Sequence, residues 1–272
     1  MKLRTRLLCI ISTFLCALFS ASAQETARIA ASLFDHGEWA LAAAYYEKLA
    51  YEDASHAPDA LEKKARCYIN LNSFDEAAST LERIPMRSIP AEERCALLHE
   101  KALANHLAGN SESAATYLDE AFALDSLSGN MLLSSLIYNE CFRFNDGLRC
   151  IRRHLRTIEA DEKTYRNVAN LYEKTPRRHN ENTALVLSII PGVGHFYNGA
   201  WEEGALSLAL NGIVITFGAA QAAGKMFVSA ILGAGIPLTY TYMGGNSRAV
   251  ELVEERNTAK ISEFNLKLIS LL

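Results

Sequence analysis

The chain has 272 residues, a formal net charge of −4, 50% hydrophobic residues and 21% charged residues. This acidic balance excludes a nucleic-acid-binding protein that relies on a global basic field, and the composition is not that of a disordered chain. The length predicts more than one structural unit. The sequence lacks the motifs of serine hydrolases, zinc proteases and paired-acid enzymes, so we expect no catalytic residues, no cofactor and no metal site.

The N-terminal segment, 1–23, has the three parts of a secretory signal peptide. These parts are a basic start, an apolar run and a stretch of small residues: Lys2, Arg4 and Arg6; 7–19; and 21–23. Cleavage is expected before Gln24. An uncleaved anchor helix is the alternative, although the apolar run is shorter than a spanning helix usually needs. Under both interpretations the residues after 24 lie outside the cytoplasm.

The mature chain contains four cysteines, Cys67, Cys95, Cys141 and Cys150, and no C-x-x-C spacing. A zinc site or a redox pair is therefore not supported. We expect most of these cysteines to be small buried core residues, because free cysteine is often buried. A disulfide between Cys141 and Cys150 is left open, since an oxidising compartment would permit it.

An internal repeat runs from residue 25 to residue 158. Small residues recur 35, 37 and 33 positions apart, at Ala42, Ala77, Ala114 and Gly147. Twelve positions before each stands another small residue: Ala30, Ala65, Ala102 and Ser135. Three positions before each residue of the first set stand Trp39, Phe74, Ser111 and Phe144. Four positions after each residue of the first set stand Tyr46, Leu81, Leu118 and Ile151. The pattern predicts helix hairpins whose small residues allow close approach, with turns at 36–37, 70–73 and 108–110.

These features resemble the tetratricopeptide repeat family, most closely at 37–48 and 73–77. The third unit departs from the family pattern at Ser111, and the fourth departs at Gly147 and lacks a clear turn. A further helix is expected at 161–175. The resemblance implies a repeat domain over 24–176 that binds protein segments on a concave face. The alternative is a packing platform without a ligand.

A basic cluster lies on the last repeat helix, at Arg149, Arg152, Arg153, His154 and Arg156. It suits either an acidic partner or anionic lipid. An ordinary solvated helix face explains it equally well.

Two uncharged segments, 205–223 and 226–243, are separated only by Gly224-Lys225. Each would form a helix ~27–29 Å long, close to the thickness of a bilayer core. They predict an antiparallel membrane hairpin with aromatic residues at its open end, including Trp201, Tyr240 and Tyr242. A buried hairpin in a water-soluble domain is the alternative. Packing inside the hairpin is assigned to Asn211, Gly212, Gly218, Gly233, Gly235 and Pro237.

A glycine-rich motif precedes the hairpin and comprises Pro191, Gly192, Gly194, His195, Tyr197, Asn198, Gly199 and Gly204. It resembles a membrane-hairpin domain with the signature P-G-x-G-x-x-Y-x-G, found fused to repeats in bacterial envelope proteins whose function is mostly unresolved. His195 stands where that family commonly has glutamine. The motif is interpreted as a structural elbow within domain 177–245, and a lipid or ligand pocket is the alternative.

The C-terminal segment, 246–272, is predicted to form an amphipathic helix capped by Asn246 or Ser247. Its apolar stripe comprises Val250, Val253, Asn257, Ile261, Phe264, Leu268 and Leu271. This face is expected to lie on the membrane, dock on the repeats or self-associate. Arg256-Asn257 and Phe264-Asn265 also resemble the tail of the same envelope proteins.

The expected fold is therefore all-α: a tetratricopeptide-like solenoid, a two-helix transmembrane hairpin and a C-terminal amphipathic helix. The expected function is a membrane-tethered scaffold that binds an envelope protein through its repeats and lipid through 205–223 and 226–243. A structural subunit of an envelope transport or assembly complex is the alternative, and a homo-oligomer is left open. The predicted location is the cytoplasmic membrane with extracytoplasmic repeats, although basic residues flanking the hairpin favour the opposite orientation.

Overall fold

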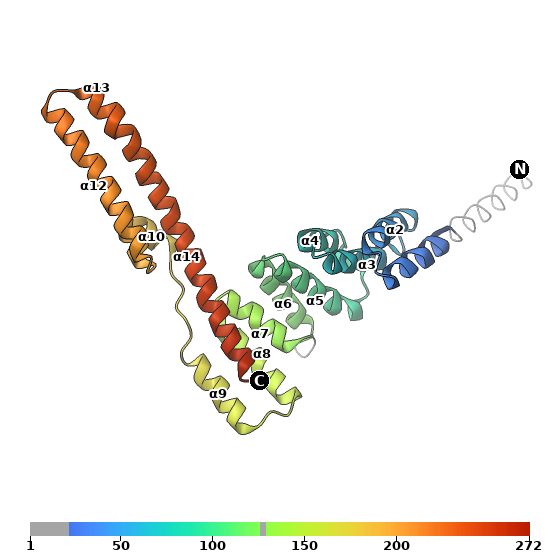
Figure 1. Ribbon diagram of the computed structural model, residues 1–272. Coiled ribbons are helices and arrows are strands. Elements are labelled where there is room, and N and C mark those ends of the chain that lie inside the picture. Colours follow the sequence, from blue (N-terminus) through green and yellow to red (C-terminus); the bar gives the residue numbers. More distant parts are fainter. Residues whose placement is uncertain (1–21, 126–128) are drawn as a thin grey trace, which may run out of the picture. The chain divides into compact units, whose positions relative to one another are not determined.

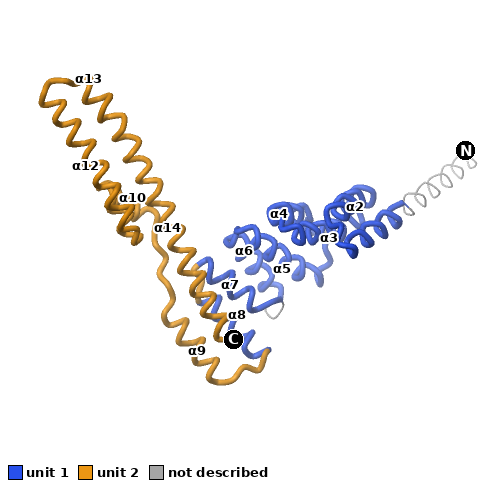
Figure 2. Tube along the Cα trace, viewed as in Figure 1, with its two compact units in different colours: residues 1–141, 145–157 blue, residues 142–144, 158–272 orange. Residues whose placement is uncertain are grey.

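The computed structural model describes residues 22–125 and 129–272, and within these ranges the regular structure is entirely helical. It divides into two compact units, which are drawn in different colours in Figure 2. Unit 1 contains the chain up to 141 together with 145–157, and unit 2 contains 142–144 and 158–272. The predicted signal peptide lies outside the described residues, except for Ser22 and Ala23, which are helical.

Unit 1 is a series of antiparallel helix pairs (Figure 1). In chain order the pairs are 22–35 with α2 (Trp39–Glu52), α3 (Ala57–Asn70) with α4 (Phe74–Glu82), α5 (Ala91–Leu107) with α6 (Ser111–Leu124), and α7 (Met131–Glu140) with α8 (Phe144–Thr157). A short 3₁₀ helix, η1 (Met86–Ser88), follows the second pair. The three predicted turns are confirmed, and the fourth, which the sequence left unclear, lies at 141–143.

Each hairpin turn contains one residue in the left-handed region of backbone space. These residues are Gly37, Asn72, Gly109 and Phe142, with φ between 57° and 81°. Glycine adopts this conformation without cost and asparagine tolerates it, whereas a phenylalanine there is strained. This difference explains why the fourth turn carries no turn signal in the sequence.

The aligned small residues lie inside the helix pairs. Ala30, Ala42, Ala77, Ala114 and Ser135 are 0% exposed, and Ala65 and Ala102 are 1% exposed. The aligned bulky residues Tyr46, Leu81, Leu118 and Ile151 are also buried. The first three belong to hydrophobic clusters between neighbouring helices. Trp39, Phe74 and Phe144 are half-buried. Small side chains thus set the spacing between helices, and the larger ones fill the gaps between them.

Replacing Ala77 with leucine is expected to destabilise the second repeat by about 1–3 kcal/mol, because the site has no room for three further carbon atoms. Thermal unfolding of the full chain measures this effect. Ser79→Leu on the exposed face of the same helix serves as control and should leave the melting temperature nearly unchanged. A melting temperature unaffected by Ala77→Leu would contradict the packing described above.

The four cysteines Cys67, Cys95, Cys141 and Cys150 are free in this structure, so the disulfide left open between the last two is not formed. Cys67 and Cys150 are buried, and burial raises the pKa of both thiols to about 11. Cys141 is partly exposed, and its Sγ donates to the backbone oxygen of Ser111 at 3.2 Å. The two thiols with raised pKa therefore behave as small apolar core residues.

Unit 2 contains a long helical hairpin (Figure 1). Its elements are α9 (Glu162–Tyr172), α10 (Glu181–Leu187), α11 (Val193–Tyr197), α12 (Trp201–Ala223), α13 (Phe227–Ala230), the π-helical η2 (Ile231–Gly235) and α14 (Ile236–Ser270). Helix α12 forms one arm. The chain reverses at Gly224-Lys225, where Lys225 has φ 61°, and α13, η2 and α14 form the second arm.

The second arm corrects two expectations. A helix start at Asn246 or Ser247 is wrong, because α14 continues through both residues without interruption. The segment 226–243 is not one regular helix, because a π turn interrupts it just before Pro237. Proline lacks an N–H group and crowds the carbonyl four residues earlier, and a π turn there admits the proline ring without breaking the arm.

Part of the predicted apolar stripe is buried in the C-terminal half of α14. Ile261, Phe264 and Leu268 are at most 4% exposed. The Phe264 ring meets the rings of Tyr172 and Phe144 edge-on, with 5.1 Å between centroids in both pairs. Aromatic pairs in this geometry are stabilising beyond the area they bury. Phe264 therefore contributes to the packing of unit 2.

Candidate functional site at the glycine-rich elbow

We define the elbow as residues 188–200, the segment that joins α10 to α12 and contains α11. Asn180 caps α10, since its Oδ1 accepts hydrogen bonds from the backbone nitrogens of Asn182 and Thr183 at 2.8 and 3.3 Å. The helix ends at Leu187, four residues before Pro191. The chain then turns through Gly192, which has φ +86° and precedes α11.

Backbone atoms of the elbow and of α12 approach one another at two glycines. A Cβ atom on Gly192 would overlap the carbonyl oxygen of Gly204, and its φ also disfavours any side chain. A Cβ on Gly204 would overlap the ring of Phe196 and would lie 2.9 Å from the carbonyl oxygen of Gly192. The two glycines are therefore required by one contact, although twelve positions separate them in sequence.

Gly194 and Asn198 join the elbow to α10 and α14. A Cβ on Gly194 would overlap Ser188 Oγ and would lie 3.1 Å from Cβ of Ala249. The buried Asn198 donates from Nδ2 to the backbone oxygens of Gly194, at 3.1 Å, and Ala249, at 2.9 Å. Because Ala249 lies on α14, this one side chain fixes the elbow against the second arm of the hairpin.

A second amide side chain holds the segment that precedes α10. Asn257 on α14 accepts from the backbone nitrogen of His179 at 2.8 Å and donates to the backbone oxygen of His179 at 3.0 Å. The His179 ring also packs on Tyr197, with 4.7 Å between centroids. Gly199, at φ +82°, lies beside the guanidinium of Arg256. Nη1 of Arg256 donates to the backbone oxygen of Tyr197 at 3.4 Å.

An ion cluster lies where the two arms approach the elbow. Arg248 pairs with Glu203 on α12 at 2.9 Å and with Glu255 and Glu251 on its own helix at 2.7 and 3.2 Å. Hydrogen bonds to these carboxylates, first of all Glu203, raise the pKa of Arg248 above its ordinary value. With three carboxylates around one guanidinium, this cluster itself carries excess negative charge.

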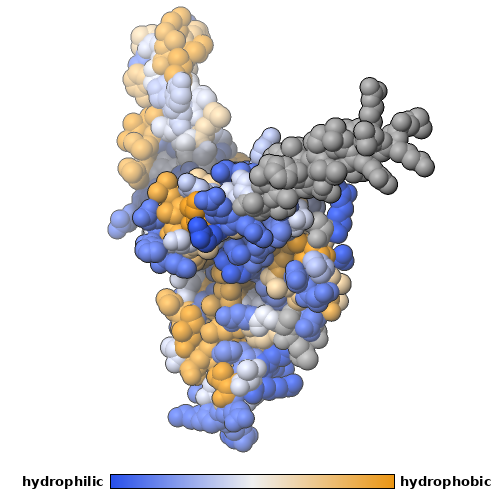
Figure 3. All heavy atoms as spheres, turned by 90° about the vertical axis from the view of Figure 1, so that its right-hand side faces the viewer, coloured by the Kyte–Doolittle hydropathy of each residue, from blue (hydrophilic) through white to orange (hydrophobic). Residues whose placement is uncertain are grey.

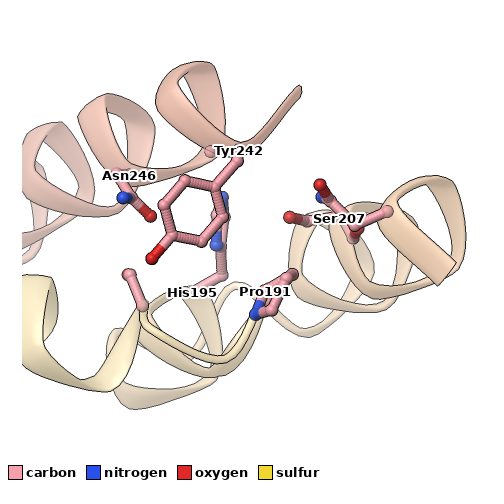
Figure 4. Close-up of a pocket in the computed structure, with 9 residues that line it drawn as sticks. Pro191, His195, Ser207, Tyr242 and Asn246 are labelled. Carbon is pink, nitrogen blue, oxygen red and sulfur yellow. The ribbon is translucent and has the colours of Figure 1, made fainter. Parts of the chain in front are cut away.

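A crevice opens between the elbow and the two arms (Figure 4). Its walls include Pro191, His195, Ser207, Tyr242 and Asn246, and it is too narrow to hold a water molecule. The His195 ring is 3% exposed, and its Nδ1 has no hydrogen-bond partner. Burial lowers the pKa of His195, so the ring is neutral at pH 7.

The two histidines of this region give an expected pH dependence. Burial lowers the pKa of both His179 and His195 below the ordinary 6.5, so the folded state binds fewer protons than the unfolded state as the pH falls. Stability should therefore be fully present above about pH 6.5 and decline below it. Unfolding measured between about pH 7.5 and pH 5 tests this. His195→Gln should reduce the decline, whereas His36→Gln at an exposed position should not.

The residues predicted to pack inside the hairpin divide into those that contact the opposite arm and those that do not. Asn211 is 1% exposed; its Nδ2 donates to Ser207 O at 2.8 Å, and its Oδ1 accepts from Thr241 Oγ1 across the arms at 2.9 Å. Gly218 faces Ala234, and Gly233 faces Phe217. By contrast, a Cβ on Gly212 would meet no atom within 4 Å, and one on Gly235 only Ile231 of its own arm, at 4.0 Å.

Several residues that hold this site were not identified from sequence. Ser188, Glu203, Arg248 and Tyr242 lack a motif, and their roles follow from contacts between distant segments. Asn257 carried a signal, because it is an amide within an otherwise apolar stripe. In residues 22–125 and 129–272, no cluster of three or more histidine, cysteine or acidic side chains is arranged to hold a metal ion. The expectations of no catalysis and no cofactor stay predictions.

Residues 33–88 match the tetratricopeptide repeat family. The matched segment runs from the first helix pair through the second pair to η1. No curated protein matches the chain. Repeats of this type form helical solenoids that serve as protein-interaction scaffolds and are typically not catalytic, which agrees with the all-α fold and with the helix pairs of unit 1.

Proposed function

We propose that the protein is a membrane-tethered scaffold, in which the repeats of unit 1 bind a protein partner and the hairpin of unit 2 anchors the chain in a bilayer. The observation that supports membrane anchoring is the exposure of the apolar side chains of α12. Among the described helices α12 alone is long and apolar enough to cross a membrane, and only 6% of its apolar window is buried. A core helix of a water-soluble domain would be mostly buried.

Large apolar side chains are exposed on both arms, on α10 and at the start of the elbow, and Figure 3 shows hydrophobic residues over the projecting end of the hairpin. They include Leu185, Val186, Ile189, Ile190, Trp201, Leu206, Leu208, Leu210, Ile213, Ile215, Phe217, Met226, Phe227, Val228, Ile231, Leu232, Ile236, Tyr240 and Met243. Contiguous apolar surface of this extent is unfavourable in water, and it supports insertion into lipid.

Hydrogen bonding also suits an apolar solvent. Thr216 and Thr239 are exposed on the two arms, and their hydroxyls donate to the carbonyls of Gly212 and Gly235 on the same arms, at 2.7 and 2.9 Å. Asn211 and Thr241 satisfy one another between the arms. In lipid an unpaired polar group costs several kcal/mol, so such internal pairing supports the membrane environment.

The proposed location is the cytoplasmic membrane, with the repeats on the extracytoplasmic side. The signal-peptide pattern at 1–23 supports this orientation, whereas basic residues such as Arg177 and Arg178 beside the hairpin favour the opposite one. Export of the long N-terminal domain fixes the orientation of the hairpin in the membrane before the short basic segments beside it can influence that orientation. For this reason we give the N-terminal pattern the greater weight.

Cysteine labelling in intact cells tests the proposal. In a background without native cysteines, single cysteines replace the exposed Gln24 or Ser247, and another replaces Lys225 at the hairpin tip. An impermeant reagent should label positions 24 and 247 from outside and leave position 225 protected until the membrane is opened. The reverse pattern would place the repeats in the cytoplasm. Extraction of the whole protein by alkaline carbonate would argue against insertion altogether.

A structural subunit of an envelope transport or assembly complex is a second candidate. It is favoured by Gly212 on α12, where an added Cβ would meet no atom of the described residues within 4 Å and where another helix could therefore approach closely. Gly212→Leu should then release a partner while leaving the hairpin folded. Under the scaffold proposal this substitution has little effect, and the repeats alone, residues 24–180, retain the partner.

A further inference from the structure

Three basic side chains of unit 2 gather around Tyr197. The His179 ring packs on the Tyr197 ring, with 4.7 Å between centroids, and Arg256 donates from Nη1 to the Tyr197 backbone oxygen at 3.4 Å. Lys260 lies one turn beyond Arg256 on α14. Burial lowers the pKa of His179, and the positive charges of Lys260 and Arg256 lower it further. The three side chains therefore act on one another, and we call them the His179 cluster.

The His179 cluster has no counter-ion within residues 22–125 and 129–272. Arg256 and Lys260 form no ion pair there, and Glu255, beside Arg256 in sequence, pairs instead with Arg248 at 2.7 Å. Burial lowers the pKa of Lys260 and the charge of Arg256 lowers it further, and no carboxylate opposes these effects. All three side chains are partly buried, so solvent screens their repulsion less than on an open surface. Like charges gathered in this way are unfavourable until an anion joins them.

Two unpaired buried atoms show how His179 can carry a second proton. Nδ1 of His179 and Oδ1 of Asn198 are both buried without a hydrogen-bond partner in the described part of the chain. Asn198 is held in place because its Nδ2 donates to the backbone oxygens of Gly194 and Ala249. Its side chain opposes the effects of burial and of the neighbouring charges, and tends to raise the pKa of His179 through a hydrogen bond. A protonated Nδ1 that donates to Asn198 Oδ1 satisfies both atoms and leaves Nε2 to donate to a ligand.

We propose that His179, Arg256 and Lys260 form a binding site for a phosphate monoester group. A monoester carries a charge close to −2 at pH 7 and three acceptor oxygens, which match the two charges of Arg256 and Lys260 and the three kinds of donor. A carboxylate or a phosphate diester carries one charge and would leave half of theirs uncompensated. The site goes beyond the scaffold function and does not depend on membrane insertion. A lipid headgroup and a soluble compound can both carry this group, and the experiment separates them.

The experiment uses the full chain in micelles of a maltoside detergent, in a buffer without phosphate and at constant ionic strength. Inorganic phosphate or glycerol phosphate is added while the melting temperature and the ring nitrogens of His179 are followed, the latter by NMR with His179→Gln for assignment. Both additions should raise the melting temperature and the pKa of His179, because a bound dianion offsets the charges of Lys260 and Arg256. Acetate should do neither. An equal response to acetate, or no response to phosphate, glycerol phosphate and phosphatidic acid, would overturn the proposal.

Matched variants separate binding from folding. Lys260→Gln should weaken the binding of inorganic phosphate about tenfold, because it removes one charge-assisted hydrogen bond. Without phosphate the same variant should be at least as stable as the unchanged chain, and the pKa of His179 should rise toward its ordinary value, because a repelling charge is gone. Lys267→Gln, on the same helix in a pair with Glu263, is the control and should bind phosphate as before. Unchanged phosphate binding by Lys260→Gln would show that the anion binds elsewhere.

Lipids added to the same micelles distinguish the two sources of the phosphate group. A response to phosphatidic acid at a lower concentration than to glycerol phosphate, lost in Lys260→Gln, would identify a lipid headgroup. A response to glycerol phosphate without one to phosphatidic acid would identify a soluble compound. An equal response to phosphatidylglycerol, a diester, would contradict the match to a dianion. A chain that stays in solution without detergent would refute membrane insertion, and the titration with inorganic phosphate in water would then decide the site separately.

Discussion

Gly204→Ala is expected to destabilise the protein by about 1–3 kcal/mol, although alanine is ordinarily the better helix residue. The added Cβ would overlap the Phe196 ring and press on the carbonyl oxygen of Gly192, which is backbone and cannot rotate away. The elbow would have to move off α12, and the Phe196–Trp201 stack, 5.2 Å between centroids, would move with it. Thermal unfolding in detergent micelles measures the loss.

The matched control is Gly212→Ala, the same substitution two turns further along the same helix. A Cβ there meets no atom within 4 Å, so only the gain in helix propensity remains. This variant should be neutral or stabilised by up to about 1 kcal/mol. Opposite effects of these two alanine substitutions on stability would establish the contact between Gly192 and Gly204. Equal effects at both positions would show that this contact is absent.

Gly147→Ala is the second substitution with a large expected effect. Gly147 stands where the other repeats have Ala42, Ala77 and Ala114, so alanine appears at first to be the better residue. In the structure a Cβ on Gly147 would overlap Oδ1 of the fully buried Asn139 and would lie 3.2 Å from the backbone oxygen of Ser135. We expect a net loss of about 1–2 kcal/mol, because overpacking outweighs the gain in helix propensity.

A double-mutant cycle in the full chain checks this explanation. If Asn139 excludes the methyl group, Gly147→Ala combined with Asn139→Ala should cost less than the two single changes added together, by about 1 kcal/mol. Strict additivity would mean that Asn139 is not the cause. A stabilised Gly147→Ala variant would mean that α7 and α8 are further apart than described here.

The repeat register could be predicted because its signals are local. Small and bulky residues recur at fixed offsets within each helix pair, and a buried face on a helix imposes such a period on the sequence. The two arms of the hairpin could be predicted for the same reason, since uncharged runs of that length divided by Gly224-Lys225 leave few other folds. The family match over 33–88 agrees with the first part. Membrane insertion stays a proposal.

Prediction from the sequence failed where a second local effect opposes the one that the residue type suggests. A cap at Asn246 or Ser247 is reasonable by residue type, yet α14 continues because its next turns pack on the elbow through Ala249. The π turn before Pro237 was also not predicted. Proline signals a break, but the arm accommodates it by inserting a residue into the turn.

By itself, the sequence determined the all-α class, the pairing of neighbouring helices in the first three repeats of unit 1 and the position of the elbow motif, because each depends on residues within a few turns of one another. Only the tertiary structure decided which glycines are crowded and which face outward, and that Asn257 holds the backbone of His179 across 78 positions of sequence. Such contacts depend on how whole helices fold back on each other. Periodicity within one helix carries no record of the helix it meets.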